Sequence, residues 1–143
     1  MSKQVTRAFL DTDVIISGLC TAEGAPAELL DRFVRGQFVA VVSHQTLEEA
    51  VLTFKNVLPD ALFPLEIFLR NVPPEVIKRP SQKDIARWSE VAKEDAEVLA
   101  SAILAGPDCV VTLNRRLLAT AIARETGLTI VTPARFLASI VKR

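Results

Sequence analysis

The sequence contains very little histidine or cysteine. His44 is the only histidine, so His-rich zinc sites and Ser-His-Asp triads have little to be built from. Cys20 and Cys109 are far apart and lack a metal-ligand spacing, and we interpret them as two reduced thiols. Any chemistry in this chain must therefore come mainly from carboxylates.

The chain also lacks an excess of charge and a long apolar run. Its 17 basic and 17 acidic residues cancel, which excludes a whole-molecule basic field for holding long duplexes. No apolar run approaches the ~20 residues of a membrane span, and residues 1–7 lack the apolar stretch of a secretory signal. We therefore expect a cytoplasmic protein that does not associate with a membrane.

Aromatic residues are scarce as well, at 6%, although half of all residues are hydrophobic. The apolar mass is therefore aliphatic, which is typical of helices packed on a parallel sheet. So high a hydrophobic fraction is incompatible with a disordered chain, and 143 residues make one ordinary domain. We interpret residues 1–143 as a single domain.

Three segments share one pattern, in which a helical apolar stretch ends at glycine and a short apolar run follows. Glycine readily takes the left-handed conformation that ends a helix, and each run closes on Ser or Thr, which are good helix caps. The segments are 27–43, 95–112 and 117–132, and a further apolar run at 7–10 ends on Asp11. Alternating strands and helices predict an α/β fold, a three-layer α/β/α sandwich around a central, mostly parallel twisted sheet of four to five strands.

The proline-containing segment 56–80 departs from this pattern. We expect a helix over Ala61–Arg70 and a short extended piece around Val76 and Ile77. Further along, Asn114 is a good N-cap for a helix over Arg115–Thr126.

Acidic residues follow the predicted strands, at the sheet edge where ligands bind in open parallel sheets. Asp11 and Asp13 come directly after an apolar run, where desolvation and mutual repulsion are costly and a divalent cation would relieve both. Glu48 and Glu49 are adjacent on the next helix and point about 100 degrees apart, so only one can face a site. Helix capping explains Asp11 and Asp95 separately, but their shared edge argues for a site.

These residues resemble a known family, the PIN-domain ribonucleases, in particular bacterial and archaeal toxins of the VapBC type. The resemblance covers roughly residues 8–140 and consists of four motifs in order, followed by a closing strand and helix. The motifs and the closing segment are Phe9–Val14, Ser43 with Glu49, Asp95–Ala102, Val110–Asn114 and Ile130–Leu137.

The resemblance implies a catalytic set of Asp11, Glu49, Asp95 and Asn114, in which the three carboxylates bind Mg²⁺ or Mn²⁺. One ion would acidify an attacking water and a second would stabilise the leaving oxygen. Thr112, Arg115 and Arg116, at and beyond the fourth motif, are candidates for binding RNA; ordinary surface arginines are the alternative.

Two positions depart from the family pattern. Asn114 stands where the family usually has a fourth Asp, so one anionic ligand is missing. Asp13 stands where Asn is usual, and it would restore that charge if its side chain pointed inward.

Two other functions remain open at this stage. A haloacid-dehalogenase-like phosphatase would use the Asp11-Thr12-Asp13 segment, but its later strand with paired acids is missing. A PIN-like RNA- or protein-binding module with a weakened site is the other, and Asn114 is its main support.

For a toxin, the resemblance implies a homodimer and an antitoxin that inserts a segment into the acidic groove; a processing nuclease is the alternative. The apolar segment Pro59–Arg70 would suit such a contact, unless its side chains simply cover the sheet.

Overall fold

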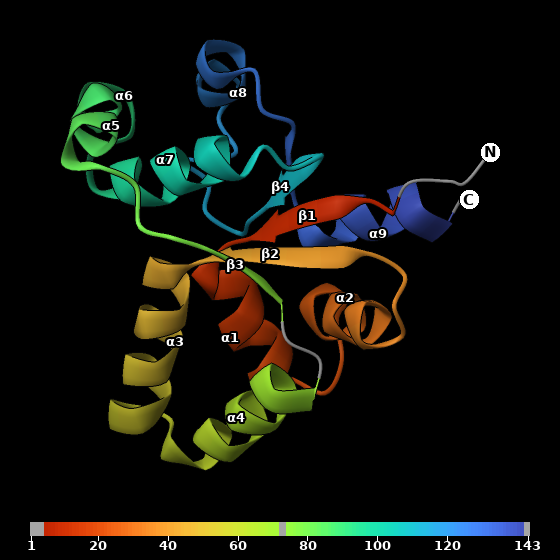
Figure 1. Cartoon of the computed structure of the whole chain (residues 1–143). Coiled ribbons are helices and arrows are strands. Elements are labelled where there is room, and N and C mark those ends of the chain that lie inside the picture. The colour runs from red at the N-terminus through yellow and green to blue at the C-terminus, as the bar shows by residue number, and fades with distance from the viewer. Residues whose placement is uncertain (1–4, 72–73, 142–143) are drawn as a thin grey trace.

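The structure, a computed structural model, describes residues 5–71 and 74–141 and is built on one parallel sheet (Figure 1). The five strands lie in the order β3-β2-β1-β4-β5, and every neighbouring pair is parallel. The strands are β1 (Arg7–Leu10), β2 (Val39–Ser43), β3 (Glu75–Ile77), β4 (Cys109–Val111) and β5 (Ile130–Val131). The predicted parallel sheet is confirmed.

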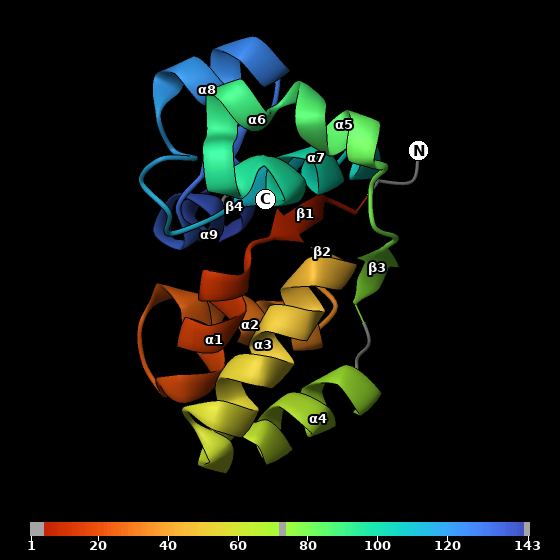
Figure 2. The ribbon, with the colours of Figure 1, turned by 90° about the vertical axis from the view of Figure 1, so that its left-hand side faces the viewer.

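Helices cover both faces of the sheet, as Figures 1 and 2 show from two directions. One face carries α1 (Thr12–Cys20), α2 (Ala25–Val34), α3 (His44–Asn56), α4 (Leu62–Asn71) and α9 (Pro133–Val141). The other carries α5 (Gln82–Arg87), α6 (Ser89–Ala92), α7 (Ala96–Ala105) and α8 (Thr120–Thr126). Short 3-10 helices, η1 (Pro59–Ala61) and η2 (Lys93–Asp95), precede α4 and α7. The predicted three-layer α/β/α architecture is confirmed.

The alternation of side chains along the central strand explains the two cores. Ala8 and Leu10 of β1 point to the core under α1, α2 and α9, whereas Phe9 points to the core under α7. All three are 0% exposed, as expected for a central strand covered on both faces. Among the described residues, no helix is long and apolar enough to cross a bilayer.

One predicted helix is shorter than expected. The segment predicted as a helix over Arg115–Thr126 forms a turn at 115–118, and α8 begins only at Thr120. The Oδ1 atom of Asn114 accepts from the N–H of Arg116, two residues on, at 3.0 Å. This local bond closes an Asx-type turn, which competes with helix initiation at Asn114.

Candidate active site

The strand order reverses at the carboxyl ends of β1 and β4, and we call the space outside these two strand ends the crevice. From β1 the chain builds β2 and β3 on one side, and then β4 and β5 on the other. Ligands bind at such topological switch points in open parallel sheets. The residues that follow the two strands, Asp11 and Thr112, lie next to each other, and the N–H of Asp11 donates to the carbonyl of Val111 at 3.1 Å.

Asp11 is held rigidly at the floor of this crevice. Its side chain accepts a hydrogen bond from the N–H of Thr12 at 2.8 Å and another from the hydroxyl of Thr112 at 2.8 Å. Only 8% of the residue is exposed, and burial raises the pKa of its carboxyl. The hydrogen bonds from Thr112 and Thr12 oppose this rise, whereas the negative charges of Asp95 and Glu49 add to it. The three predicted metal-binding acids are therefore electrostatic neighbours.

Thr112 has a different position from the one we expected. It is 0% exposed, so its side chain lies inside the protein rather than on the surface, and its contact with RNA stays a prediction. Its hydroxyl donates to Asp11 and accepts from the N–H of Asn114 at 3.0 Å. Thr112 thus connects the first and fourth motifs and orients Asp11.

Replacing Thr112 with valine, which has the same shape, should destabilise the fold by about 2 kcal/mol. The change leaves a buried carboxylate oxygen and a backbone N–H without their partner, and this desolvation penalty is not recovered. Urea unfolding measures the loss, and the exposed Thr120→Val serves as the control. A loss for Thr112→Val no larger than for the control would contradict this role.

Glu49, and not Glu48, is the glutamate on the site side of α3. Its Oε2 atom accepts from the hydroxyl of Thr12 at 3.0 Å, and its Oε1 atom accepts from the side chain of Gln45 at 2.9 Å. Glu48 instead pairs with Arg79 at 2.8 Å, and Arg79 also pairs with Glu97 of α7 at 3.4 Å. Ser43 caps α3 and starts it at the same sheet edge as Asp11, which brings Glu49 to the site.

Asp95 lies in η2, at the entry to α7, and faces Asn114. The Nδ2 atom of Asn114 donates to its Oδ1 atom at 3.2 Å, and Arg116 forms an ion pair with its Oδ2 atom at 3.3 Å. This Oδ2 atom is buried and accepts no hydrogen bond from the described part of the chain. Arg116 also pairs with the neighbouring Glu94, so its guanidinium is held against η2.

Asp13 belongs to the site, although its orientation could not be inferred from the sequence. Its carboxylate accepts from the N–H of Leu113 at 3.3 Å, on the loop after β4. Burial raises its pKa to about 6, and the charges of Asp11 and Asp95 add to the rise. The sequence signals were its place beside Asp11 directly after an apolar run and its position where the family usually has Asn.

The comparison with known families agrees with this arrangement. A profile of the PIN domain matches residues 7–116. The chain belongs to the PIN-domain family. The match spans all four motifs, confirms the resemblance stated from the sequence, and favours it over the phosphatase alternative.

Two solved structures share the PIN fold with this chain. VapBC2 from Rickettsia felis, solved with a DNA fragment from its promoter, has a TM-score of 0.63 at 17% identity, covering 88% of this chain and 98% of that one. PAE2754 from Pyrobaculum aerophilum has a TM-score of 0.65 at 18% identity, covering 96% of this chain and 91% of that one. No curated protein sequence matches the chain. At these identities the two structures show a common fold.

The side chains gathered at this site offer carboxylate oxygens, the type of ligand atom that suits a hard divalent cation. Carboxylate oxygens are the ligands that Mg²⁺ and Mn²⁺ prefer, and the buried Oδ2 atom of Asp95 accepts no hydrogen bond from the described residues, although Arg116 is its ion-pair partner. Within residues 5–71 and 74–141, however, no three acidic, histidine or cysteine side chains form a ready-made ion site. Glu49 and Asp95 instead bond to Thr12 and Asn114. An ion would therefore have to draw these side chains away from their present partners.

Lys93, the first residue of η2, has a strained backbone. Lys93 has a φ of 50° and a ψ of −119°, and it is the only non-glycine residue with a positive φ in the described ranges. Such conformations strongly favour glycine, and they concentrate at functional sites. The strained residue lies two positions before Asp95.

Replacing Lys93 with glycine should raise the free energy of unfolding by about 1 kcal/mol. Relief of the strain outweighs the greater freedom of glycine in the unfolded chain. The matched control is Lys83→Gly in the first turn of α5, where glycine should destabilise the protein. Thermal unfolding of both variants measures the difference, and destabilisation by Lys93→Gly would argue against strain at this position.

Proposed function

We propose that this PIN domain is a metal-dependent ribonuclease that hydrolyses phosphodiester bonds of RNA. The observation that carries the proposal is the buried carboxylate of Asp11 at the switch point of the sheet, whose pKa the charges of Asp95 and Glu49 raise further. Like charges gathered in a buried crevice repel one another, and a divalent cation is the natural counter-charge. Members of the PIN-domain family are, moreover, generally nucleases.

Asp11, Glu49 and Asp95 would hold Mg²⁺ or Mn²⁺, with Asn114 as the fourth catalytic position. Such an ion would supply an activated water and would stabilise charge on the phosphate oxygens. The chain itself keeps Asp11 in place through Thr112 and aligns Asp95 through Asn114. No nucleophilic side chain is required, which suits a chain with one histidine.

Arg115 and Arg116 would contact the phosphates of the RNA. Both are exposed and follow the loop after β4, beside the acidic crevice. Arg116 is already oriented by Glu94 and Asp95, so it would meet a phosphate next to the reacting one. Guanidinium groups bind phosphate oxygens with paired N–H donors.

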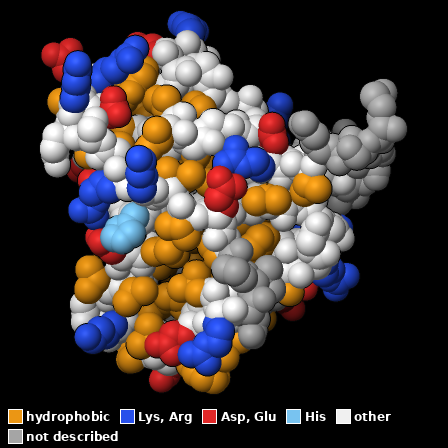
Figure 3. Space-filling model, viewed as in Figure 1, with side chains coloured by type: hydrophobic (Ala, Val, Ile, Leu, Met, Phe, Trp, Pro, Cys, Tyr) orange, Lys and Arg blue, Asp and Glu red, His pale blue; other side chains and the backbone are white. Residues whose placement is uncertain are grey.

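A toxin with an antitoxin partner and a homodimeric assembly is the finer form of this proposal. Apolar side chains are exposed on α3, on the segment that follows it and on α4, and Figure 3 shows hydrophobic surface gathered over these helices. Leu52, Val57 and Phe63 are 57%, 70% and 69% exposed. A patch of this kind suits a protein contact. VapBC2, a structural neighbour, was solved with DNA from its promoter.

A weakened, non-catalytic module is the second candidate. Asn114 favours it, because its amide donates to Asp95 where the family usually has an acid. In that case the crevice would bind RNA or a protein without cleaving RNA.

Incubation of the purified protein with labelled single-stranded and structured RNAs tests the main proposal. Separate reactions contain Mn²⁺, Mg²⁺ or a chelator. We expect cleavage with metal and none with the chelator. Cleavage that persists in the chelator would refute metal dependence, and intact RNA under every condition would favour the non-catalytic module.

A further inference from the structure

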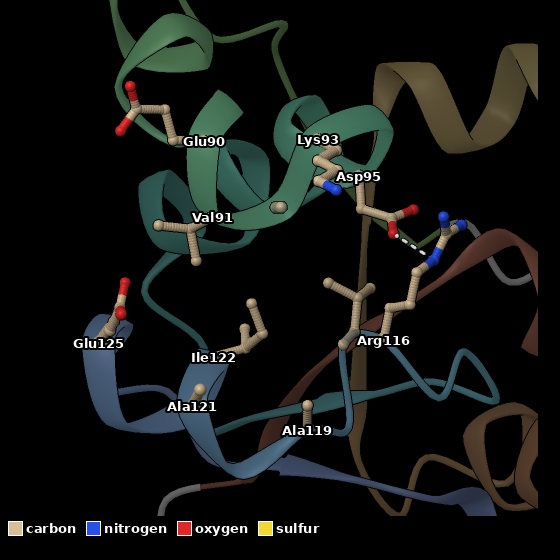
Figure 4. A pocket seen from close by; sticks show the side chains of 11 residues that line it. Glu90, Val91, Lys93, Asp95, Arg116, Ala119, Ala121, Ile122 and Glu125 are labelled. Atoms are coloured by element: carbon tan, nitrogen blue, oxygen red, sulfur yellow. Dashed lines mark ion pairs between the residues drawn. The ribbon is translucent and has the colours of Figure 1, made fainter.

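A hollow of about 610 Å³ opens beside the acidic crevice (Figure 4). It lies between the α6–η2 segment and the segment that runs from the turn at 115–118 into α8. Asp95 and Arg116, which form an ion pair, line the hollow and also belong to the acidic site, so the hollow lies directly beside it. Its volume is in the range of binding sites for small organic groups.

The hollow has apolar walls and charged ends. Its walls are the aliphatic side chains of Val91, Ala92, Leu117, Ala119, Ala121 and Ile122. Figure 4 shows Lys93 and Arg116 gathered with Asp95 at one end, and Glu90 and Glu125 at the other. The two cations therefore lie at the end next to the crevice, where Arg116 pairs with Asp95, and the two glutamates lie at the opposite end.

We propose that this hollow is a base subsite, which holds one unpaired nucleobase of the RNA next to the phosphate being cleaved. The proposal rests on the proposed ribonuclease function and adds a specificity determinant to it. A nucleotide is complementary to the hollow. Its anionic phosphate matches the cationic end, the apolar faces of its base match the aliphatic walls, and N–H donors on the base edge match the two glutamates. The phosphate would lie by Lys93 and Arg116, and the base would lie between the aliphatic walls.

Glu90 and Glu125, at the end remote from the crevice, would make the subsite selective among bases. Ionised Glu90 and Glu125 only accept hydrogen bonds, so they suit a base edge that carries amino or imino N–H donors. A base can reach them only when it is unpaired and unstacked, as in single-stranded RNA or a loop.

The strained backbone of Lys93 is a second, independent observation at the same place. A positive φ at a lysine is retained only when the surrounding structure imposes it. Here it places a cation at the phosphate end of the hollow, two residues from Asp95. A glycine would remove both the strain and the cation, so stability and RNA binding should change in opposite directions in Lys93→Gly.

Ala121→Trp tests the subsite, because Ala121 is exposed on α8 and lines the hollow, so that an indole there would occupy the space proposed for the base. The matched control is Ala138→Trp, on an exposed position of α9. Cleavage of a random-sequence RNA with Mn²⁺, read by sequencing, reports base preference beside the cut. Photo-crosslinking of 4-thiouridine RNA in chelator, with mapping of the linked peptide, reports base contact without any cleavage.

We expect the parent and Ala138→Trp to prefer certain bases at one position beside the cut and to crosslink within residues 90–95 or 115–125. Ala121→Trp should lose this preference, cleave preferred sites about tenfold more slowly and lose the crosslink. Lys93→Gly should also crosslink more weakly, although it folds at least as stably as the parent.

The two readouts separate the subsite from the nuclease. Crosslinks in the hollow that Ala121→Trp removes, with no cleavage by the parent, would support the subsite and refute the nuclease. Cleavage by Ala121→Trp with the parent's preference would overturn the subsite and leave the nuclease standing. If Ala121→Trp keeps the crosslinks of the parent but sediments as a different oligomer, the subsite would also be overturned. The hollow would then be an interface between copies of this chain.

Discussion

Asp11→Asn is expected to lower metal-dependent RNA cleavage about a thousandfold, while the protein stays folded. The substitution keeps the shape of the side chain but removes the charge at the floor of the crevice. A lost metal ligand removes several kcal/mol of transition-state stabilisation, and each 1.36 kcal/mol is a factor of ten in rate. Single-turnover cleavage of the preferred RNA at saturating Mn²⁺ measures the effect.

The metal-free Asp11→Asn protein should be about as stable as the parent, because removal of a buried negative charge next to two acids offsets the one hydrogen bond that the amide nitrogen cannot accept. The matched control is Asp31→Asn on α2, whose carboxylate is 47% exposed and pairs with Arg35. The control should cleave as the parent does. Equal cleavage by Asp11→Asn and Asp31→Asn would show that the chemistry lies elsewhere on the molecule.

Asn114→Asp should change metal affinity and metal-free stability in opposite directions. The amide of Asn114 donates to Asp95, and a carboxylate there would replace this hydrogen bond with repulsion between two acids. Loss of a bond to a charged group should destabilise the metal-free protein by about 2 kcal/mol. The added charge should strengthen Mn²⁺ binding about tenfold, because the same repulsion is relieved when the ion binds.

Calorimetric titration with Mn²⁺ and thermal unfolding in chelator measure the two effects of Asn114→Asp. Asn56→Asp, at the exposed end of α3, is the control and should change neither quantity appreciably. Stronger metal binding with a rise in cleavage would mean that Asn114 weakens a working site. Unchanged affinity would place Asn114 outside the metal site.

The sheet could be predicted from the sequence because glycines mark the helix ends and short apolar runs follow them. Gly106 and Gly127 end α7 and α8 in the left-handed conformation, as expected from their positions. The strands β4 and β5 then begin within a few residues. Strand ends of a parallel sheet share one edge, which is why Asp11 could be placed near the fourth motif.

The details of the site depend on three-dimensional contacts that no sequence pattern reports. Whether Glu48 or Glu49 faces the crevice depends on the rotation of α3, which Ser43 sets through its cap. Asp13 faces inward because the loop after β4 offers it the N–H of Leu113, a residue 100 positions away. Thr112 was expected to contact RNA, but it is buried directly after β4, where its hydroxyl donates to Asp11.

The strain at Lys93 and the turn at 115–118 were equally inaccessible from the sequence. Lysine is an ordinary residue at the start of a helix, so nothing in the pattern suggests a φ of 50°. Asn114 was expected to cap a helix at once, but it closes a turn with Arg116. Both features line the hollow beside the site.

Titration of the protein with Mn²⁺, followed by electron paramagnetic resonance of the free ion, is the most direct test of the central claim that the acidic crevice binds a metal. We predict binding by the parent, binding at least tenfold weaker by Asp11→Asn, and parental binding by Asp31→Asn. Equal binding by all three proteins, or no binding by the parent at millimolar Mn²⁺, would contradict the claim.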